Sequence, residues 1–330
     1  MIIDKLIENA KQNKKTIVLP ETNDIRVLSA AEEVSKLDFA DIILIGNKDT
    51  INELATKNNI DISKTKIIDP NNSSYTEELV NKFYEIRKHK GITIVEAENI
   101  IKNDYLYFGD MLVYMGYADG LVAGACHSTS DVLRAALQTV KTSSDSKIVS
   151  SFFIMELENK NLGSNGIYIY SDCGMIQNPT SEELVNIAYS SSKSFETLIG
   201  DTPKIAFLSH STNGSSKHID VDKVKNAVIK FKETYPSIIA DGELQLDAAI
   251  IPSITKSKYP NSKIQGDANI LIFPDLDSGN IAYKITERMA NAKAYGPITL
   301  GIKKPINDLS RGCNSDDIVG VIAITCNQAK

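Results

Sequence analysis

The chain has 330 residues, of which 42% are hydrophobic and 24% are charged, and its formal net charge is −6. This length exceeds what one hydrophobic core usually supports, so we expect about two domains of ordinary globular composition. The acidic balance argues against a nucleic-acid-binding protein, because phosphate contacts require a concentrated basic face. No apolar run approaches the roughly 18 to 20 residues of a membrane span, and the first residues lack the apolar centre of a secretory signal. We therefore expect a cytoplasmic protein with no membrane partner.

Residue types that often carry special chemistry are few. The four cysteines form no CxxC pair and the four histidines lie far apart, so neither a disulfide framework nor a metal site is indicated. Only five of the 36 basic residues are arginine: Arg26, Arg87, Arg134, Arg288 and Arg311. An arginine in such a lysine-rich chain is a candidate for bidentate binding of an anion, although an exposed ion pair is the commoner role for any single one.

Strand and helix patterns alternate along the first part of the chain. Runs of β-branched residues predict the strands, and apolar residues at helical spacing predict the helices. The predicted strands are 14–21, 41–46, 65–70 and 118–124, and the predicted helices include 24–36, 75–90, 94–116 and 128–141. Such alternation is typical of an open, largely parallel sheet covered by helices.

A second set of elements follows the polar stretch KTSSDS near residue 145. Two β-rich runs, 147–157 and 166–173, are joined by turn-like residues and resemble a hairpin. The next predicted elements are helices at 181–195, 221–235 and through 285–295, and strands at 204–209 and 269–275. Two α/β domains are the natural interpretation.

Three strand-to-loop junctions are rich in small hydroxylated residues: 124–131, 209–216 and 275–280. In open α/β sheets, ligands collect at the carboxyl ends of strands, where loop amides and helix N-termini hold anions. These loops therefore suit phosphate. The alternative is that they only cap helices and form turns, because none has a GxxxxGKS/T or GxGxxG pattern. His127 and His210 lie in such loops, where a lone histidine is more often structural than catalytic.

The segment 308–317 gathers acids, a hydroxyl and an arginine directly before an apolar helical pattern. Ser315 is a plausible N-cap of that helix, with Asp316 and Asp317 in its first turn. Acids at the positive end of a helix dipole explain Asp316 well. The functional interpretation makes Asp317 a general base.

Capping does not explain Asp308, Ser310 or Arg311, which precede a tight turn at Gly312. No histidine lies near Ser310 and there is no Gly-x-Ser-x-Gly elbow, so an acyl-serine mechanism has little support. We therefore expect Ser310 to donate a hydrogen bond rather than to act as a nucleophile.

Long motifs spread over the chain carry a family resemblance. They are YEIRKHKG, LVAGACHSTSDVLRAALQTVKT, ADGELQLDAAI, FPDLDSGNIAYKITERMANAKAYGP and PINDLSRGCNSDDIVGVIAITC. These motifs resemble those of phosphate acetyltransferase (phosphotransacetylase), and the resemblance runs from KTIVLPET to the C-terminus.

The resemblance implies reversible transfer of acetyl between acetyl phosphate and coenzyme A, with coenzyme A as a substrate and with neither a metal nor a permanently bound cofactor. It also implies a fold of two open, mostly parallel α/β domains, related to isocitrate and isopropylmalate dehydrogenases, with the active cleft between them. The first domain is then discontinuous, 1–144 plus 296–330, and the second is 145–295. A homodimer is expected, and the lack of a long N-terminal extension argues against the regulated long form.

The resemblance and the chemistry together suggest roles for individual residues. Asp317 would deprotonate the thiol of coenzyme A, Ser310 would donate a hydrogen bond to the thiolate or the tetrahedral intermediate, and Arg311 would offset negative charge. The residues expected to hold the phosphoryl group are Arg87, Arg134, Ser128 and Thr129. Further residues expected to line the coenzyme A or phosphate side of the cleft are Ser209, Ser211, Thr212, Gly214, Ser215, Ser278, Gly279 and Asn280.

Three alternatives stay open. A phosphate butyryltransferase or another short-acyl transferase differs by one or two methylenes, which change discrimination by only about 1 to 3 kcal/mol each. An NAD-dependent decarboxylating dehydrogenase of the same fold would need a cluster of aspartates around a divalent ion and a tyrosine–lysine pair, which the sequence does not supply. A non-catalytic anion-binding protein would not need the acid, hydroxyl and arginines together.

Overall fold

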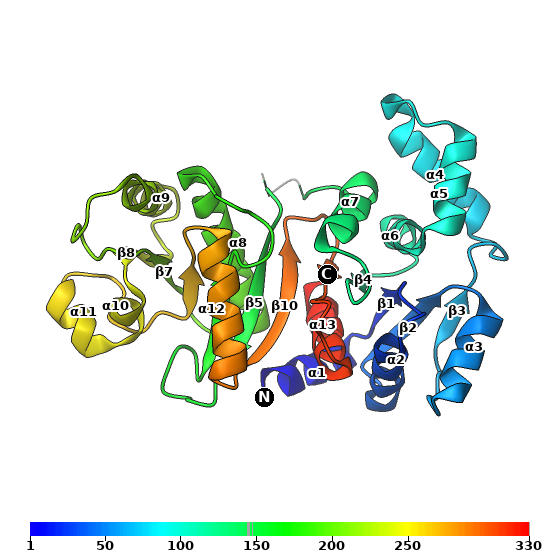
Figure 1. The fold of residues 1–330 in the computed structure, drawn as a ribbon, viewed down its shortest axis with the longest axis horizontal. Coiled ribbons are helices and arrows are strands. Elements are labelled where there is room, and N and C mark those ends of the chain that lie inside the picture. The colour runs from blue at the N-terminus through cyan, green and yellow to red at the C-terminus, as the bar shows by residue number, and fades with distance from the viewer. Residues whose placement is uncertain (144–145, 147, 330) are drawn as a thin grey trace. The chain divides into compact units, whose positions relative to one another are not determined.

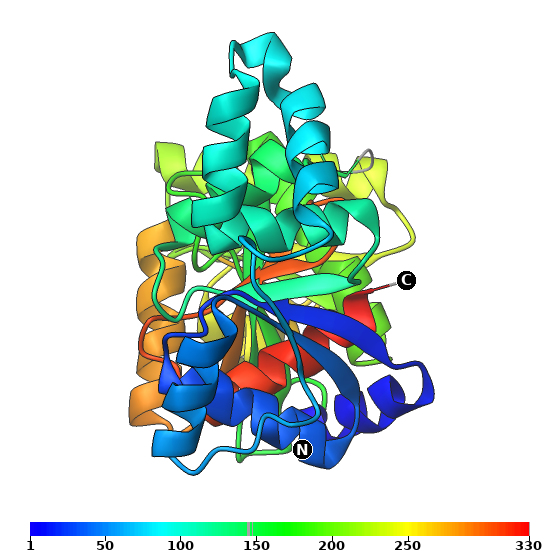
Figure 2. The same ribbon diagram turned by 90° about the vertical axis from the view of Figure 1, so that its right-hand side faces the viewer.

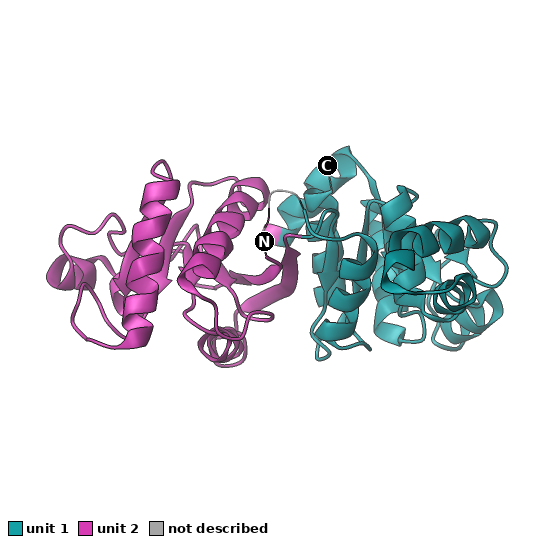
Figure 3. Ribbon diagram, turned by 90° about the horizontal axis from the view of Figure 1, so that it is seen from above, with its two compact units in different colours: residues 1, 3–144, 302–330 teal, residues 2, 145–301 magenta. Residues whose placement is uncertain are grey.

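The computed structural model describes residues 1–143, 146 and 148–329. The chain divides into two compact units, shown in different colours in Figure 3. Unit 1 consists of Met1, Ile3–Ser144 and Ile302–Lys330, and unit 2 of Ile2 and Asp145–Gly301.

Of the two domain boundaries expected from the sequence, the one between residues 144 and 145 lies outside the described residues. The other, between residues 295 and 296, falls inside strand β10 (Lys293–Leu300). This strand pairs with β5 (Ser150–Glu156) from Lys293 to Leu300. The chain therefore returns to unit 1 only after the strand has ended, several residues later than expected.

Unit 1 is built on a parallel sheet of five strands in the order β11-β4-β1-β2-β3. The strands are β1 (Lys15–Leu19), β2 (Ala40–Ile45), β3 (Lys66–Ile68), β4 (Gly120–Ala123) and β11 (Ile306–Asp308). Ile17 of β1 is paired with Ile42 of β2 on one side and with Gly120 of β4 on the other. All four residues of β4 are buried, as expected for a central strand with helices on both faces.

Helices cover both faces of this sheet, as Figures 1 and 2 show. One face carries α1 (Ile2–Gln12), α2 (Ile25–Leu37), α3 (Lys48–Lys57) and α13 (Ser315–Gln328). The other face carries α6 (Tyr105–Met115) and α7 (Thr129–Thr139). The pair α4 (Thr76–Arg87) and α5 (Ile94–Asn103), joined by the 3-10 turn η1 (Lys88–Lys90), packs on α6 and projects beyond the sheet in Figure 2.

The core of unit 1 lies between this sheet and α6, and it explains why the apolar patterns fold as they do. Phe83 of α4, Phe108 and Leu112 of α6, and Leu121 of β4 belong to one cluster and are 0% exposed. Burying each such side chain contributes about 1.5 to 3 kcal/mol before entropy is counted. The scaffold beneath the strand ends is therefore well packed.

Unit 2 contains a mixed sheet of six strands in the order β10-β5-β6-β9-β7-β8. Its further strands are β6 (Ile167–Ser171), β7 (Lys204–Leu208), β8 (Ile239–Leu244) and β9 (Ile270–Ile272). The strands from β6 to β8 are parallel, whereas β10, β5 and β6 pair antiparallel. The hairpin predicted from 147–157 and 166–173 is confirmed in its described part, because β5 and β6 are antiparallel neighbours.

The helices of unit 2 are α8 (Ser181–Leu198), α9 (Ile219–Thr234), α10 (Leu246–Ile250), α11 (Pro252–Lys258) and α12 (Leu276–Met289). The helix predicted through 285–295 is wrong at its end. It stops at Met289, Asn291 takes a left-handed conformation with φ 53°, and β10 starts at Lys293. Both units are thus α/β with mostly parallel strands, as predicted from the alternating patterns.

Candidate active site

The candidate catalytic residues lie at the carboxyl edge of the sheet in unit 1. The strands β11, β4 and β1 are parallel neighbours, so the loops 309–314, 124–128 and 20–24 that follow them meet at one edge. The chain adds β2 and β3 on one side of β1 and then places β4 on the other side. Such a reversal of strand order is where ligands bind in open α/β sheets.

The Arg26 side chain holds these three loops together. Its Nη1 donates to the carbonyl oxygens of Arg311 at 2.9 Å and Cys313 at 2.8 Å, and its Nη2 donates to that of Ala125 at 3.0 Å. Asp24, the N-cap of α2, orients the guanidinium by accepting hydrogen bonds from Nε and Nη2. This hydrogen bond holds the pKa of Asp24 below its usual value and raises that of Arg26. The sequence left Arg26 without a role.

Glu21 occupies the backbone amides of the loop after β4. Its buried carboxylate accepts hydrogen bonds from the amides of Gly124, Ala125, Cys126 and His127, all at 2.8 to 2.9 Å. It also contacts Nδ1 of His127 at 2.8 Å, which agrees with a structural role for this histidine. The sequence suggested that the loop 124–131 holds phosphate. The amides of residues 124 to 127, however, already donate to the Glu21 carboxylate.

Ser128 and Thr129, whose hydroxyls are expected to bind phosphate, come directly after these four amides in the chain. Ser128 is the N-cap of α7, and its Oγ accepts from the amide of Asp131 at 3.2 Å and donates to the Asp131 carboxylate at 2.6 Å. Thr129 Oγ1 is 2.5 Å from Oδ2 of Asp308, the last residue of β11. Ser128 is therefore used as a cap, whereas Thr129 joins the loop after β4 to the strand before the catalytic segment.

The catalytic segment proper forms a tight turn and the start of α13. Ser310 is half-buried, and its carbonyl oxygen accepts from the amide of Cys313 at 2.9 Å. Arg311 is exposed. Burial raises the pKa of the neighbouring Asp308, and the charge of Arg311 opposes this rise. Asp317 is half-buried in the first turn of α13. These side chains come from one short stretch at the same edge of the sheet.

The start of α13 differs from the prediction in one respect. Asn314, not Ser315, is the N-cap: its side chain accepts from the amide of Asp317 at 2.9 Å, and Asp317 accepts from the amide of Asn314 at 2.9 Å. This reciprocal pair is a capping box. It fixes the backbone of Asp317 and the direction of its carboxylate, which the proposed base requires.

Arg87 and Arg134 lie on two helices that contact each other, α4 and α7. Arg87 is the last residue of α4, and Arg134 lies on α7, where its Nη1 is 3.0 Å from Asp131 Oδ1. Both guanidinium groups oppose the rise in the pKa of Tyr107 on α6 that burial causes, so they lie on the same side of unit 1. Arg134 thus makes the ordinary ion pair that the sequence left as the alternative. No ion pair of Arg87 is found within the described part of the chain.

The hydroxylated loop after β7 in unit 2, residues 209–216, is held by hydrogen bonds within the loop and to Glu243 of β8. Buried Glu243 accepts from Ser211 Oγ at 2.8 Å and from the Gly214 amide at 2.7 Å. Ser215 Oγ accepts from the Thr212 amide at 3.0 Å. A further contact joins Ser209 Oγ, as acceptor, to the Ser211 amide at 3.2 Å. As Glu21 does in unit 1, a buried glutamate accepts hydrogen bonds from the loop. A role of this loop in binding coenzyme A or phosphate stays a prediction.

The residues Ser278, Gly279 and Asn280 do not lie in a loop, which corrects the expectation for 275–280. They belong to the first turns of α12, whose N-cap Asp275 accepts from the Ser278 amide at 2.8 Å. A Cβ on Gly279 would lie 2.4 Å from the carbonyl oxygen of Asp172, so this position needs glycine for close packing. Asn280 Nδ2 donates to the Cys173 carbonyl at 3.2 Å. These residues pack α12 against the loop after β6.

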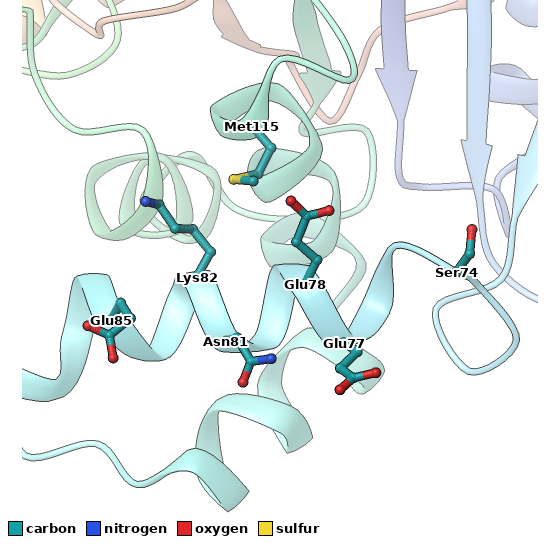
Figure 4. A pocket seen from close by; sticks show the side chains of 7 residues that line it. All are labelled: Ser74, Glu77, Glu78, Asn81, Lys82, Glu85 and Met115. Carbon is teal, nitrogen blue, oxygen red and sulfur yellow. The ribbon is translucent and has the colours of Figure 1, made fainter.

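Unit 1 has one pocket along α4 and another along α5. The first pocket, in Figure 4, is lined by three acids, Glu77, Glu78 and Glu85, together with Ser74, Asn81, Lys82 and Met115. None of the predicted site residues lines it. The second includes Arg87 and Gln138. In the described part of the chain, no group of three or more histidine, cysteine, aspartate or glutamate side chains could hold a metal ion. Nor does that part contain a helix long and apolar enough to cross a membrane.

Comparison with known proteins decides the family. Residues 1–326 match the family described as phosphate acetyl/butaryl transferase. The chain belongs to this family. It is 51% identical over 328 residues to the phosphate acetyltransferase of Acetivibrio thermocellus, which covers 99% of this chain and 98% of that protein.

Solved phosphotransacetylases show the same fold. The structure from Staphylococcus aureus is 41% identical with a TM-score of 0.90, and the match covers 100% of this chain and 98% of that one. The structure from Streptococcus pyogenes is 40% identical with a TM-score of 0.91, covering 99% and 98%. Membership in the phosphate acetyl/butaryl transferase family is therefore supported by sequence and by fold.

Proposed function

We propose that this chain catalyses the reversible transfer of an acetyl group between acetyl phosphate and coenzyme A, giving acetyl-CoA and orthophosphate. The observation that carries this conclusion is the match over essentially the full length, at about half identity, to a protein named phosphate acetyltransferase. The chemical groups at the carboxyl edge of the unit 1 sheet are consistent with it. They supply a base, a hydroxyl donor and a cation in one short segment.

The first step is activation of the thiol. A thiol with a pKa of about 8.5 is only slightly ionised at neutral pH, so attack on the acetyl carbonyl benefits from a general base. Asp317 takes the thiol proton as the sulfur attacks the carbonyl carbon. The capping box with Asn314 holds this carboxylate in place.

The second step is collapse of the tetrahedral intermediate. The carbonyl electrons return and the bond between the acetyl carbon and the bridging phosphate oxygen breaks. Orthophosphate leaves with the proton that came from the thiol, which restores the Asp317 carboxylate. Ser310 donates a hydrogen bond to the negatively charged sulfur or oxygen, and Arg311 offsets the charge. Arg87, Arg134 and Thr129 hold the phosphoryl group, with Ser128 shaping the helix start beside it.

We also propose the cofactor requirement, the location and the oligomeric state that accompany this function. Coenzyme A is a substrate, and the chemistry needs neither a metal nor a resident cofactor. We place the protein in the cytoplasm and expect a homodimer.

One surface that suits a second copy is on α12, where Ile281, Ile285 and Met289 are 56%, 51% and 81% exposed at successive helical turns. The relation to isocitrate and isopropylmalate dehydrogenases stays a prediction.

Butyryl transfer is the second candidate, because the family description covers both acyl groups. The test is consumption of the coenzyme A thiol by purified protein, with acetyl phosphate and butyryl phosphate compared at equal concentration. We expect a clear preference for acetyl phosphate. A preference for butyryl phosphate would assign the second function, and no thiol loss with either substrate would reject both.

A further inference from the structure

Asp308 is a buried acid at the end of β11, directly before the catalytic segment, and the mechanism above gives it no role. It ends β11, two residues before Ser310, and its side chain is 0% exposed. Its Oδ2 lies 2.5 Å from Thr129 Oγ1, and its buried Oδ1 makes no hydrogen bond of ordinary geometry with any described residue. A carboxyl group in such a setting is costly unless it is protonated or serves a purpose.

The backbone is built closely around this carboxyl group. A Cβ at Gly124, where φ is 115°, would lie 2.2 Å from Asp308 Oδ1. The loop after β4 therefore packs directly on the acid and leads within five residues to Thr129. The contact between Asp308 and Thr129 thus connects the strand before the catalytic turn with the proposed phosphate-binding hydroxyl.

We propose that Asp308 is a positioning residue for the acyl phosphate: in its protonated state it donates to Thr129 Oγ1 and leaves the Thr129 hydroxyl proton to donate to a phosphoryl oxygen. This inference rests on the proposed function and on Thr129 as a phosphate ligand. A hydroxyl group has one proton and two lone pairs. Ionised Asp308 accepts that single proton, whereas protonated Asp308 supplies its own.

The surroundings of Asp308 make both states accessible near neutral pH. Burial raises its pKa to about 7, although the Thr129 hydrogen bond and the Leu309 amide lower it. Glu21, from the loop after β1, raises the pKa further, and Arg311 lowers it. The helices α7 and α13 also pack on β11, and their first turns carry further acids, at positions 131, 316 and 317, with Arg134 one turn later on α7.

The direction of the pH effect follows from the direction of this shift. Below pH 7 the protonated acid leaves the Thr129 proton to the substrate. As the pH rises through about 7, Asp308 ionises, takes the Thr129 proton and adds a negative charge beside the phosphoryl group. The KM for acetyl phosphate should therefore rise with pH over this range in the wild-type protein, independently of any change in kcat.

The test compares the pH profiles of KM for acetyl phosphate in the wild type, Asp308→Asn and Asp308→Ala. Acetyl phosphate is varied because inorganic phosphate itself changes charge near neutral pH. The asparagine amide donates to Thr129 at every pH, so Asp308→Asn should keep the low-pH value of KM and lose the rise. Asp308→Ala removes both the donor and the carboxylate, so Thr129 is no longer held in place for its hydrogen bond to the phosphoryl group. KM should then be about tenfold above the wild-type value at low pH and should not change with pH.

The chain offers a matched control in Asp110 of α6. It is another acid with 1% exposure, its Oδ2 accepts from a threonine hydroxyl (Thr139, 3.4 Å), and burial likewise raises its pKa. Asp110→Asn should leave the KM profile of the wild type unchanged. Thr129→Val gives a second route: it keeps the shape of the side chain and should raise KM and flatten the profile.

The outcomes separate this inference from the proposed function. If the wild type consumes thiol but Asp308→Asn keeps the wild-type rise in KM between pH 6 and 8, Asp308 is not a positioning residue. A wild-type KM in Asp308→Ala or in Thr129→Val would overturn it equally. Absence of thiol consumption by the wild type would instead reject the proposed function, and this inference with it.

Discussion

Arg26 fixes the geometry of the candidate site by binding backbone carbonyl oxygens in two of its loops. Its guanidinium donates to carbonyl oxygens of the loops after β4 and β11 while Asp24 holds it from α2. A planar group with five donors is suited to this task, and a lysine ammonium is not. Arg26 therefore acts on catalysis by holding Arg311 and its neighbours in place.

We predict that Arg26→Lys lowers kcat/KM about tenfold and the free energy of unfolding by about 1 to 2 kcal/mol, because two or three charge-assisted hydrogen bonds are lost from a partly exposed group. Steady-state kinetics and urea unfolding measure both effects. Arg288→Lys is the matched control, because Arg288 is exposed and its ion pair is with adjacent Glu287 at 3.4 Å. Equal results for the two substitutions would show that Arg26 is an ordinary surface arginine.

At the scale of elements, the start of α13 determines where the proposed base lies. Asn314 caps the helix and Asp317 closes the capping box, so the helix terminus and the catalytic carboxylate depend on the same pair of hydrogen bonds. The Ser315 hydroxyl, which the sequence suggested as the cap, lies one residue inside the helix.

We predict that Asn314→Ala lowers the free energy of unfolding by about 1 kcal/mol, the usual cost of losing an N-cap, and also lowers kcat. Asn314→Ser should recover most of the stability, because serine caps helices nearly as well. Ser315→Ala should change little. A larger loss of stability in Ser315→Ala than in Asn314→Ala, measured by urea unfolding, would show that the cap is misassigned.

Helix α6 carries another buried acid, Asp110, which should make stability depend on pH. Burial raises the pKa of Asp110 well above its value in the unfolded chain, so the folded state binds more protons and stability falls as the pH rises above the unfolded pKa. We predict that Asp110→Asn removes part of this fall, up to about 1.4 kcal/mol for each pH unit over which one proton is taken up. Urea unfolding between pH 5 and 8 tests it; parallel curves for wild type and variant would contradict the assignment.

Across the whole molecule, the sequence predicted elements with a clear apolar pattern, including the three-residue strands β3 and β9, but it missed β8, β10 and β11. The alternating strands and helices of unit 1 and the hairpin of unit 2 follow from apolar periodicity. The strand β11 has only three residues, and its Asp308 interrupts the apolar pattern, so nothing local marks it as a strand. The sequence pattern places the start of β10 in the preceding helix, because helix-forming residues precede the strand and no proline or glycine marks the end of the helix.

The candidate site shows the same division between local and distant information. The motif residues from Ser310 to Asp317 were found because they are adjacent in sequence. Glu21 and Arg26 were not assigned, since the groups they bind lie about one hundred to nearly three hundred residues away, at separations of 103 and 287 for example. A pattern in one stretch of sequence cannot reveal such partners. Charged residues directly after a buried strand, as in PETND, are the only local signal that points to them.

The most direct test of the account is the kcat of Asp317→Asn beside that of Asp316→Asn, its neighbour in the same helical turn. The asparagine keeps an oxygen for the capping box but cannot take the thiol proton. We predict that kcat of Asp317→Asn falls at least about 100-fold at neutral pH and recovers as the pH approaches the thiol pKa of about 8.5, whereas Asp316→Asn stays near the wild type. Near-full turnover in Asp317→Asn would contradict the assignment of the base and with it the mechanism proposed for this site.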